Sequence, residues 1–311
     1  MKPDILLVEP LMPVIEAALD ANYRLHRLYR ADDAREIEAA LPRIRAVVTG
    51  GGSGLSNDWI SRLPALGVIA INGVGTDKVD LKFARSRNID VTTTPGILTE
   101  DVADIGVALM LALLRRVTEG DRFVRAGRWP QTGFPLGRSP RGKRVGILGL
   151  GQIGKAFGRR AEAFGMQVGY WNRSLVPDCA WKSFGSAAAL AAESDVLVAC
   201  IAATAATQNI VDAEVLRALG SDGILVNISR GNVVDETALL EALNDGVIGG
   251  AGLDVFVDEP NIRPAFCNAP NTVLMPHQGS ATYETRLAMG ELVVANVGAY
   301  FAGSTPPTTV N

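Results

Sequence analysis

Short apolar runs recur along this chain and alternate with longer amphipathic stretches. Segments such as 155–165 and 235–246 place apolar residues at helical spacing. Nine apolar runs have the length of a strand, at residues 5–8, 46–49, 67–71, 89–93, 144–149, 166–171, 195–201, 224–229 and 271–275. Near-continuously apolar strands are typical of parallel sheets, which helices cover on both faces. The pattern therefore predicts an α/β protein.

Two irregular stretches interrupt this alternation. A Pro-Gly turn at 95–96 separates the first group of strands from a strongly apolar helix, and residues 125–144 are rich in Gly, Pro and Arg. The apolar run 105–114 is about half the length needed to cross a bilayer. We expect it to be buried against another domain or subunit. The breaks predict an α/β domain before residue 98 and a larger one after it.

Composition and charge narrow the classes of function. The chain has 311 residues, and 48% of them are hydrophobic, which is enough for two sizeable cores. The formal net charge is −3 and no long run of like charges occurs, which argues against binding to nucleic acid or to an anionic membrane surface.

The cysteines and the first residues indicate the compartment. Cys179, Cys200 and Cys267 lie far apart without a metal-ligand spacing, so we predict small buried side chains, no metal site and a reducing compartment. The opening MKPDILLVEP is too weakly apolar for a signal peptide. We therefore expect a cytoplasmic protein.

The segment RVGILGLGQIG at 144–154 places Gly149, Gly151 and Gly154 in a G-x-G-x-x-G spacing. In a dinucleotide-binding turn the first glycine permits a tight bend, the second admits a pyrophosphate, and the third lets the helix pack on the strand. The spacing alone is weak, since a glycine turn can be merely structural. Here a strand precedes it, and a helix and a second strand follow, which favours dinucleotide binding.

The end of that second strand bears on which cofactor is bound. An NAD site usually presents a carboxylate there to the ribose 2′-hydroxyl, whereas this chain has Asn172, Arg173 and Ser174. An arginine with two short polar side chains can hold a 2′-phosphate, so NADP(H) is favoured and NAD(H) stays possible. Alternatively, Arg173 is only a solvated surface charge.

Three polar residues follow predicted strands at the edge where open α/β sheets bind ligands. They are Arg230, His277, and Glu259, which lies just beyond a strand expected near 248–255. Each alone is more often a solvated or structural residue. Together they suit the reduction of a 2-oxo acid by a nicotinamide. Arg230 can hold the carboxylate, His277 can protonate the developing alkoxide, and Glu259 can favour the protonated imidazole.

Several motifs together resemble the D-isomer-specific 2-hydroxyacid dehydrogenases. They are GLGQIG at 149–154, VNISRGNVVDE at 226–236, GLDVFVDEP at 252–260 and PHQGSAT at 276–282. Residues 72–81, 94–116 and 160–165 resemble the glyoxylate/hydroxypyruvate reductase and hydroxyphenylpyruvate reductase branch. The resemblance runs over nearly the whole chain.

The resemblance implies a role for each matching position. Arg230, Glu259 and His277 match the substrate arginine, the glutamate that orients the histidine, and the proton donor. Val74 and Gly75 match main-chain groups that receive the substrate carboxylate, in an active site between two domains. Trp129 matches an aromatic residue that in the family often extends toward the active site of the neighbouring subunit. Alternatively, Trp129 only packs in a dimer interface. The implied cofactor contacts are Gly149, Leu150, Gly151, Gln152, Ile153, Gly154, Asn172, Arg173, Ser174, Ile228, Ser229, Asp254 and Gly279.

The resemblance also implies two Rossmann-like, doubly wound parallel-sheet domains, the smaller one discontinuous. Residues 1–97 and 283–311 form the substrate domain, and 98–282 bind the dinucleotide. One departure from the family pattern is CIAATAATQNI at 200–210, where alanines replace a Pro-containing segment and leave contacts beside the nicotinamide open.

The function implied is that of a homodimeric, NADPH-preferring reductase of glyoxylate, hydroxypyruvate and similar 2-oxo acids to D-2-hydroxy acids. An aryl-pyruvate reductase of the same family is the alternative, and a cofactor-sensing corepressor is a distant one. A formate-dehydrogenase-like activity is disfavoured because that branch carries glutamine at the position of Glu259.

Overall fold

The computed structural model describes residues 2–30 and 34–311, and these form two compact units. Unit 1 comprises Met1–Leu98 and Ala281–Asn311, and unit 2 comprises Thr99–Ser280. The sequence predicts divisions at 97/98 and 282/283. Both units are α/β folds built on entirely parallel sheets, which confirms the predicted fold class.

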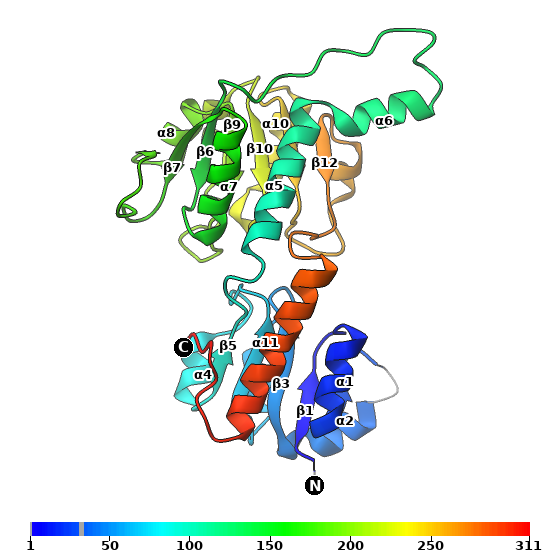
Figure 1. Cartoon of the computed structure of the whole chain (residues 1–311), viewed down its shortest axis with the longest axis vertical. Helices are drawn as coiled ribbons and strands as arrows, with labels where there is room; N and C mark the ends of the chain where they lie inside the picture. Colours follow the sequence, from blue (N-terminus) through cyan, green and yellow to red (C-terminus); the bar gives the residue numbers. More distant parts are fainter. Residues whose placement is uncertain (1, 31–33) are drawn as a thin grey trace. The chain divides into compact units, whose positions relative to one another are not determined.

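Unit 1 is a five-stranded sheet in the order β2-β1-β3-β4-β5, the flavodoxin-like order (Figure 1). Its strands are β1 (Asp4–Leu7), β2 (Arg24–Arg27), β3 (Ile44–Gly50), β4 (Val68–Asn72) and β5 (Asp90–Thr92). Its helices are α1 (Pro13–Asn22), α2 (Ala34–Ala40), α3 (Asn57–Ser61), α4 (Leu81–Ser86) and α11 (Tyr283–Phe301), with a 3-10 turn at Leu41–Arg43.

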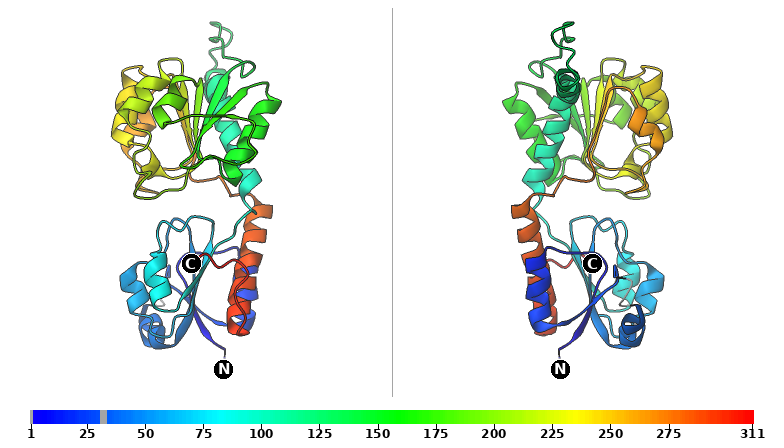
Figure 2. Two further views of the ribbon diagram at one scale, coloured as in Figure 1. Left: turned by 90° about the vertical axis from the view of Figure 1, so that its left-hand side faces the viewer. Right: turned by 90° about the vertical axis from the view of Figure 1, so that its right-hand side faces the viewer.

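The central strands of unit 1, β1, β3 and β4, are buried on both faces. Ile5 and Leu7 of β1 pack with α1 and α11, whereas Leu6, between them, faces the core under α2, α3 and α4. Figure 2 shows α11 and α1 together on one side of this sheet. The two-residue alternation of a strand therefore accounts for the continuous apolar run that the sequence displayed.

Unit 2 is a seven-stranded sheet in the order β12-β11-β10-β9-β6-β7-β8, the order of a dinucleotide-binding sheet with one added strand. Its strands are β6 (Arg144–Leu148), β7 (Gln167–Trp171), β8 (Lys182–Ser183), β9 (Val196–Ala199), β10 (Ile224–Asn227), β11 (Gly250–Leu253) and β12 (Thr272–Leu274). Its helices are α5 (Thr99–Leu114), α6 (Val117–Arg125), α7 (Gln152–Ala163), α8 (Ala187–Ala192), α9 (Ala213–Leu219) and α10 (Glu236–Asn244), with 3-10 turns at Gly231–Val233 and Pro264–Asn268.

Helices α5 and α7 lie side by side on one face of this sheet, and α8, α9 and α10 cover the other (Figures 1 and 2). Gly106 of α5 permits close packing, because an added Cβ would lie 2.9 Å from Ile228 Cδ1 and 3.0 Å from Phe157 of α7. The apolar run 105–114 thus packs on the sheet of its own unit.

The sequence did not predict two of the strands, β2 and β8. β2 reads RLHR, and β8 has only two residues, so neither offers an apolar run. β2 is set instead by parallel pairing with β1, and by the buried contact of 2.7 Å between His26 Nε2 and Asp4 Oδ1.

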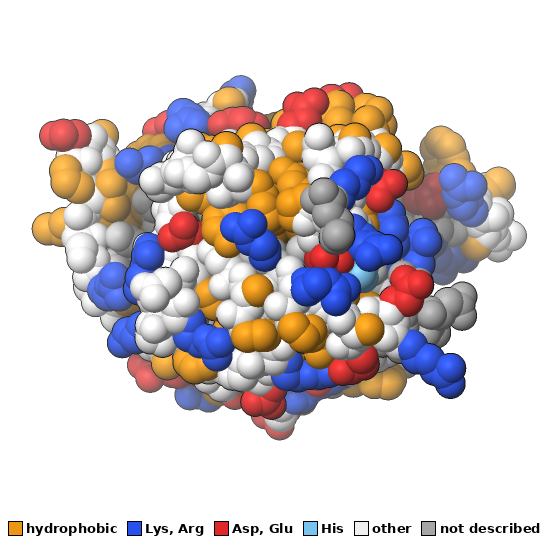
Figure 3. Space-filling model, turned by 90° about the horizontal axis from the view of Figure 1, so that it is seen from below, with side chains coloured by type: hydrophobic (Ala, Val, Ile, Leu, Met, Phe, Trp, Pro, Cys, Tyr) orange, Lys and Arg blue, Asp and Glu red, His pale blue; other side chains and the backbone are white. Residues whose placement is uncertain are grey.

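The cysteines are less buried than predicted, since Cys179 and Cys200 each keep part of their surface exposed. All three cysteines are free, and burial raises the pKa of Cys200 to about 12. Cys267, however, is exposed in the turn before β12 and is not a core residue. The surface in Figure 3 intersperses basic, acidic and apolar side chains, in line with the small net charge.

Candidate active site

The glycine turn of unit 2 lies where the strand order of the sheet reverses, between β6 and β9. Gly149 has φ +92°, and an added Cβ there would lie 2.6 Å from the Ile201 backbone. At Gly154 an added Cβ would lie 2.4 Å from Gly149 O. Each of these glycines therefore has the steric reason that the sequence assigned to it.

Gly151 differs from its two neighbours in the motif. An added Cβ there would meet no heavy atom within 4 Å, so the chain itself leaves this side of the turn open. Gly151 caps α7 without a side-chain hydrogen bond. The N–H groups of the first turn, including those of Gln152 and Ile153, have no partner within the helix and can bind an anion. The residues present fit the pyrophosphate of a dinucleotide.

The polar stretch after β7 lies at the adjoining strand end. Asn172 Nδ2 donates to Ser174 O at 3.0 Å, which closes a short turn with Arg173 exposed at its centre. The strand end carries no carboxylate that would repel a 2′-phosphate. This turn can therefore offer a cation to the adenosine ribose.

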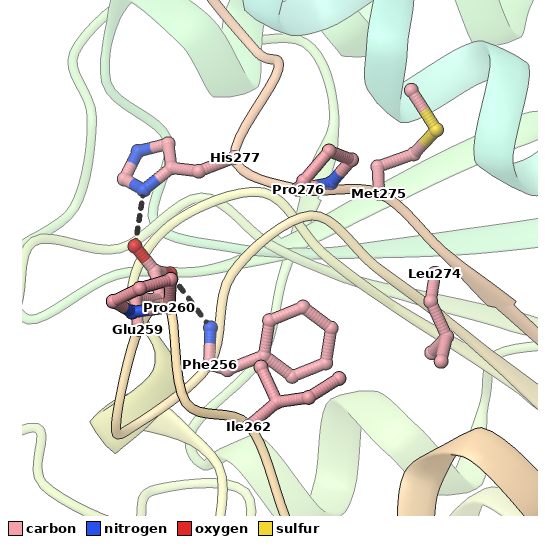
Figure 4. Close-up of a pocket in the computed structure, with 8 residues that line it drawn as sticks. All are labelled: Phe256, Glu259, Pro260, Ile262, Leu274, Met275, Pro276 and His277. Atoms are coloured by element: carbon pink, nitrogen blue, oxygen red, sulfur yellow. Dashed lines mark hydrogen bonds and ion pairs between the residues drawn. The ribbon is translucent and has the colours of Figure 1, made fainter.

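Arg230, Glu259 and His277 follow three strands that are neighbours in the sheet, β10, β11 and β12. His277 Nδ1 lies 2.6 Å from Glu259 Oε2, and the other carboxylate oxygen, Oε1, accepts the Phe256 N–H at 2.8 Å (Figure 4). The structure thus brings the predicted glutamate and histidine together, in a bond that leaves the Nε2 atom of the ring for another partner.

The electrostatics of this pair favour a charged glutamate. Burial raises the pKa of Glu259, but hydrogen bonds from His277 and from the Phe256 N–H outweigh it and hold the pKa below its usual value. The positive charges of His277 and Arg230 act in the same direction. The site thus pairs a carboxylate, held in its charged form, with an imidazole at hydrogen-bond distance.

Asp254, at the end of β11, fixes the backbone that carries His277. Its main-chain oxygen accepts the His277 N–H at 2.9 Å, and its carboxylate accepts the N–H groups of Gln278 at 2.6 Å and Gly279 at 2.8 Å. These bonds hold His277 in a left-handed conformation with φ +54°, which a non-glycine residue adopts at a cost of about 1–2 kcal/mol.

Asp254 is also the most deeply buried acid of this group, with 2% of its surface exposed. Burial raises its pKa, while the N–H groups of Gln278 and Gly279 act in the opposite direction. The sequence resemblance suggested only a cofactor contact for Asp254. Its hold on the histidine loop depends on tertiary contacts across 23 or more positions and had no local signal.

An apolar cavity of about 300 Å³ lies beside the Glu259–His277 pair. Residues of the turns after β11 and β12 line it, namely Phe256, Glu259, Pro260, Ile262, Leu274, Met275, Pro276 and His277 (Figure 4). The remaining predicted residues lie elsewhere. Ile228 and Ser229 form the turn after β10, and Val74 and Gly75 follow β4 in unit 1.

A helix N-terminus open to pyrophosphate at the switch point of a parallel sheet is typical of dinucleotide-dependent oxidoreductases. Comparison with known proteins narrows this class. Residues 107–279 match the model of the D-isomer specific 2-hydroxyacid dehydrogenase, NAD binding domain, and the chain belongs to this family. It therefore binds a nicotinamide dinucleotide and is a reductase of 2-oxo acids.

Relatives within the family differ in substrate. The chain is 49% identical to the 2-ketogluconate reductase of Gluconobacter oxydans over 99% of both chains. It is 43% identical to the hydroxyphenylpyruvate reductase of Plectranthus scutellarioides over 96% of both. A crystal structure of the NADPH-dependent glyoxylate/hydroxypyruvate reductase of Sinorhizobium meliloti, with NADP and malonate, has a TM-score of 0.94 and 39% identity and covers 100% of this chain and 97% of that one.

Two further features concern residues 2–30 and 34–311. None of the helices there has both the length and the apolar content to cross a membrane. In the same residues, no group of three or more His, Cys, Asp or Glu side chains is arranged to hold a metal ion.

Proposed function

We propose that the protein is an NADPH-preferring reductase of small 2-oxo acids, glyoxylate and hydroxypyruvate first, that produces D-2-hydroxy acids. The observation that carries this proposal is the 2.6 Å contact between Glu259 and His277 at the ends of adjoining strands, with Arg230 after the next strand. A charged glutamate, a histidine and an arginine supply the proton and the carboxylate-binding cation that the reduction needs.

In the proposed reaction Arg230 binds the substrate carboxylate in a bidentate manner and polarises the carbonyl group. The nicotinamide supplies the hydride to the carbonyl carbon when it is bound. His277 donates its Nε2 proton to the carbonyl oxygen, because Nδ1 is engaged by Glu259. Glu259 orients the ring through Nδ1 and does not itself give up a proton.

We propose that Val74 and Gly75 of unit 1 also receive the substrate carboxylate. Both follow β4, at the carboxyl edge of its sheet. Three buried side-chain oxygens at the ends of β4 and β5 have no hydrogen-bond partner in the described residues, those of Asn72, Thr92 and Thr94. Unpaired polar atoms at a ligand-binding edge support a polar ligand there.

The preference for NADPH rests on the turn after β7. Arg173 is exposed at its centre, Asn172 and Ser174 flank it, and no carboxylate opposes a 2′-phosphate. The likeness to a reductase whose structure contains NADP supports the same preference. Measured kcat/KM values with NADPH and NADH, at saturating glyoxylate, test this part of the proposal.

An aryl-pyruvate substrate is the second candidate. The cavity of about 300 Å³ beside His277 is lined mainly by apolar side chains, which would suit an aromatic ring better than a hydroxymethyl group. Steady-state kinetics with glyoxylate, hydroxypyruvate, hydroxyphenylpyruvate and 2-ketogluconate distinguish these substrates. A kcat/KM that is highest for hydroxyphenylpyruvate would replace the first candidate by the second.

We further propose a cytoplasmic homodimer. Helix α6 and the loop that follows it project from the sheet of unit 2 (Figure 1). Their exposed apolar side chains include Trp129, 68% exposed, and Leu136, 93% exposed. An apolar surface on a projecting arm suits burial against a second copy of the chain. The three free cysteines suit a reducing compartment.

A further inference from the structure

Asn227, the last residue of β10, is a buried polar side chain inside the motif at 226–236, and the proposed reaction gives it no role. Only 1% of its surface is exposed. Its Nδ2 atom donates to Arg230 O at 2.9 Å, and its Oδ1 atom accepts the Ser229 N–H at 3.0 Å and the Ser229 hydroxyl at 2.9 Å. The side chain thus closes the turn between the strand and Arg230.

The same turn is fixed from its other end. Gly231, directly after Arg230, packs so tightly on the next turn that an added Cβ would lie 2.0 Å from the carbonyl carbon of Phe256. Phe256 in turn donates its N–H to Glu259. Arg230 is therefore held between the Asn227 clamp and the turn that carries the glutamate.

The main chain of Asn227 extends this arrangement to the histidine. Its carbonyl oxygen accepts the Asp254 N–H at 3.0 Å, and Asp254 holds the backbone of His277. Two buried polar residues at neighbouring strand ends, Asn227 and Asp254, thus each fix the turn that bears a reactive side chain.

We propose that Asn227 is a positioning residue for the substrate carboxylate, and that it acts by fixing the backbone from which the Arg230 guanidinium extends. This inference rests on the proposed function and deepens it. A bidentate contact demands a defined position and direction of the guanidinium plane, so a loosened turn weakens carboxylate binding. Asn227 itself touches neither substrate nor reacting atoms.

The test compares Asn227→Ala with the wild type, using oxamate as a carboxylate probe of the NADPH-bound protein. We expect the Kd of oxamate and the KM of the 2-oxo acid to rise about tenfold, because three partly buried groups of the turn lose their partner. The Kd of NADPH alone should change by less than about threefold, since the glycine turn and the stretch after β7 remain intact.

Asn296→Ala is a matched control. Asn296 is also fully buried, and it likewise exchanges three hydrogen bonds with a neighbouring turn, in this case at Thr308 of unit 1. We expect this variant to lower Tm without changing the Kd of oxamate. The control separates the loss of a buried amide in general from the loss of this one.

Asn227→Asp keeps the shape of the side chain and serves if the alanine variant does not fold. Its carboxylate lacks the N–H that donates to Arg230 O, but a protonated carboxyl group can donate. We expect weaker oxamate binding than in the wild type, with a deficit that shrinks as the pH is lowered.

Three outcomes decide the question. Asn227 variants that bind oxamate as the wild type does would overturn the inference and leave the proposed function intact. So would an equal loss of oxamate and NADPH binding, which indicates general disruption. A wild type that binds no oxamate and reduces no 2-oxo acid would overturn the proposed function and this inference with it.

Discussion

Glu259 Oε2 lies 2.6 Å from His277 Nδ1, although 18 positions separate the two residues in the sequence. They follow β11 and β12, which are parallel neighbours, so the sheet brings their turns to the same edge. The contact fixes which ring nitrogen is engaged and gives the imidazole an anionic partner. The first two predictions examine these consequences.

Replacement of His277 by alanine should lower kcat for 2-oxo acid reduction by about 10²–10⁴, the usual contribution of a general acid. The Kd of NADPH, measured by fluorescence titration, should stay nearly unchanged. The other histidine provides the control. His26→Ala removes the partner of buried Asp4 and should lower Tm while kcat is retained. A His277 variant within a few-fold of wild-type kcat would rule out the acid role.

Glu259→Gln should lower kcat for 2-oxo acid reduction, because a neutral amide cannot form the charge-assisted hydrogen bond that holds the His277 ring. The loss should be smaller than that of His277→Ala, since the ring itself remains. Steady-state kcat of both variants beside that of the wild type checks this. A Glu259 variant with wild-type kcat would show that the contact does not contribute to the reaction.

The same glutamate should leave a signature in stability at low pH. Its pKa in the folded protein is lowered from the ordinary 4.5, so its pairing stabilises the fold above that pH. This contribution is lost as the pH falls through the lower, folded-state pKa. Thermal melts should therefore converge for wild type and Glu259→Gln in strong acid. A gap that stays constant to low pH would contradict this.

Arg173→Ala should raise the KM for NADPH by about 10- to 100-fold, the loss expected for a charge-assisted contact with a phosphate. The KM for NADH, which lacks that phosphate, should hardly change. The exposed Arg35 in α2 offers a matched control, since Arg35→Ala should affect neither cofactor. Equal losses with NADPH and NADH would mean that Arg173 does not discriminate between them.

Gly151→Ala and Gly154→Ala should fail in different ways. At Gly151 a methyl group meets no protein atom, so Tm should be kept while NADPH binding weakens. At Gly154 it would lie 2.4 Å from Gly149 O, and the overpacking should cost about 1–3 kcal/mol of stability. Melting curves and NADPH titrations measure both. A Gly151 variant with normal NADPH affinity would place the pyrophosphate elsewhere.

Trp129→Ser combined with Leu136→Ser should weaken the proposed dimer. The two side chains are exposed on the arm after α6, and their burial against a second copy would supply apolar contact. Sedimentation velocity over a range of concentrations would show dissociation at higher concentration than for the wild type. A wild type that is monomeric throughout would contradict the dimer.

The sequence by itself determined the α/β class, most of the strands and the types of side chain available for binding and catalysis. Apolar runs such as 224–229 and 144–149 predict buried parallel strands. The steric requirements of one short turn explain the positions of Gly149, Gly151 and Gly154. Arg230, Glu259 and His277 could be found because each is a polar residue within a few positions of the end of an apolar run.

Only the tertiary structure decided how these groups are held. The edge strands β2 and β8 exist because a neighbouring strand pairs with them, not because of their own pattern. Asp254 bonds to the backbone of the loop that bears His277, and Asn227 bonds to the main chain of Arg230. Both contacts depend on which strands are neighbours in the sheet. They also depend on burial, because a buried polar side chain at a strand end must bond to the adjoining turn. Local sequence encodes which residues end a strand, whereas sheet order determines which of those ends meet.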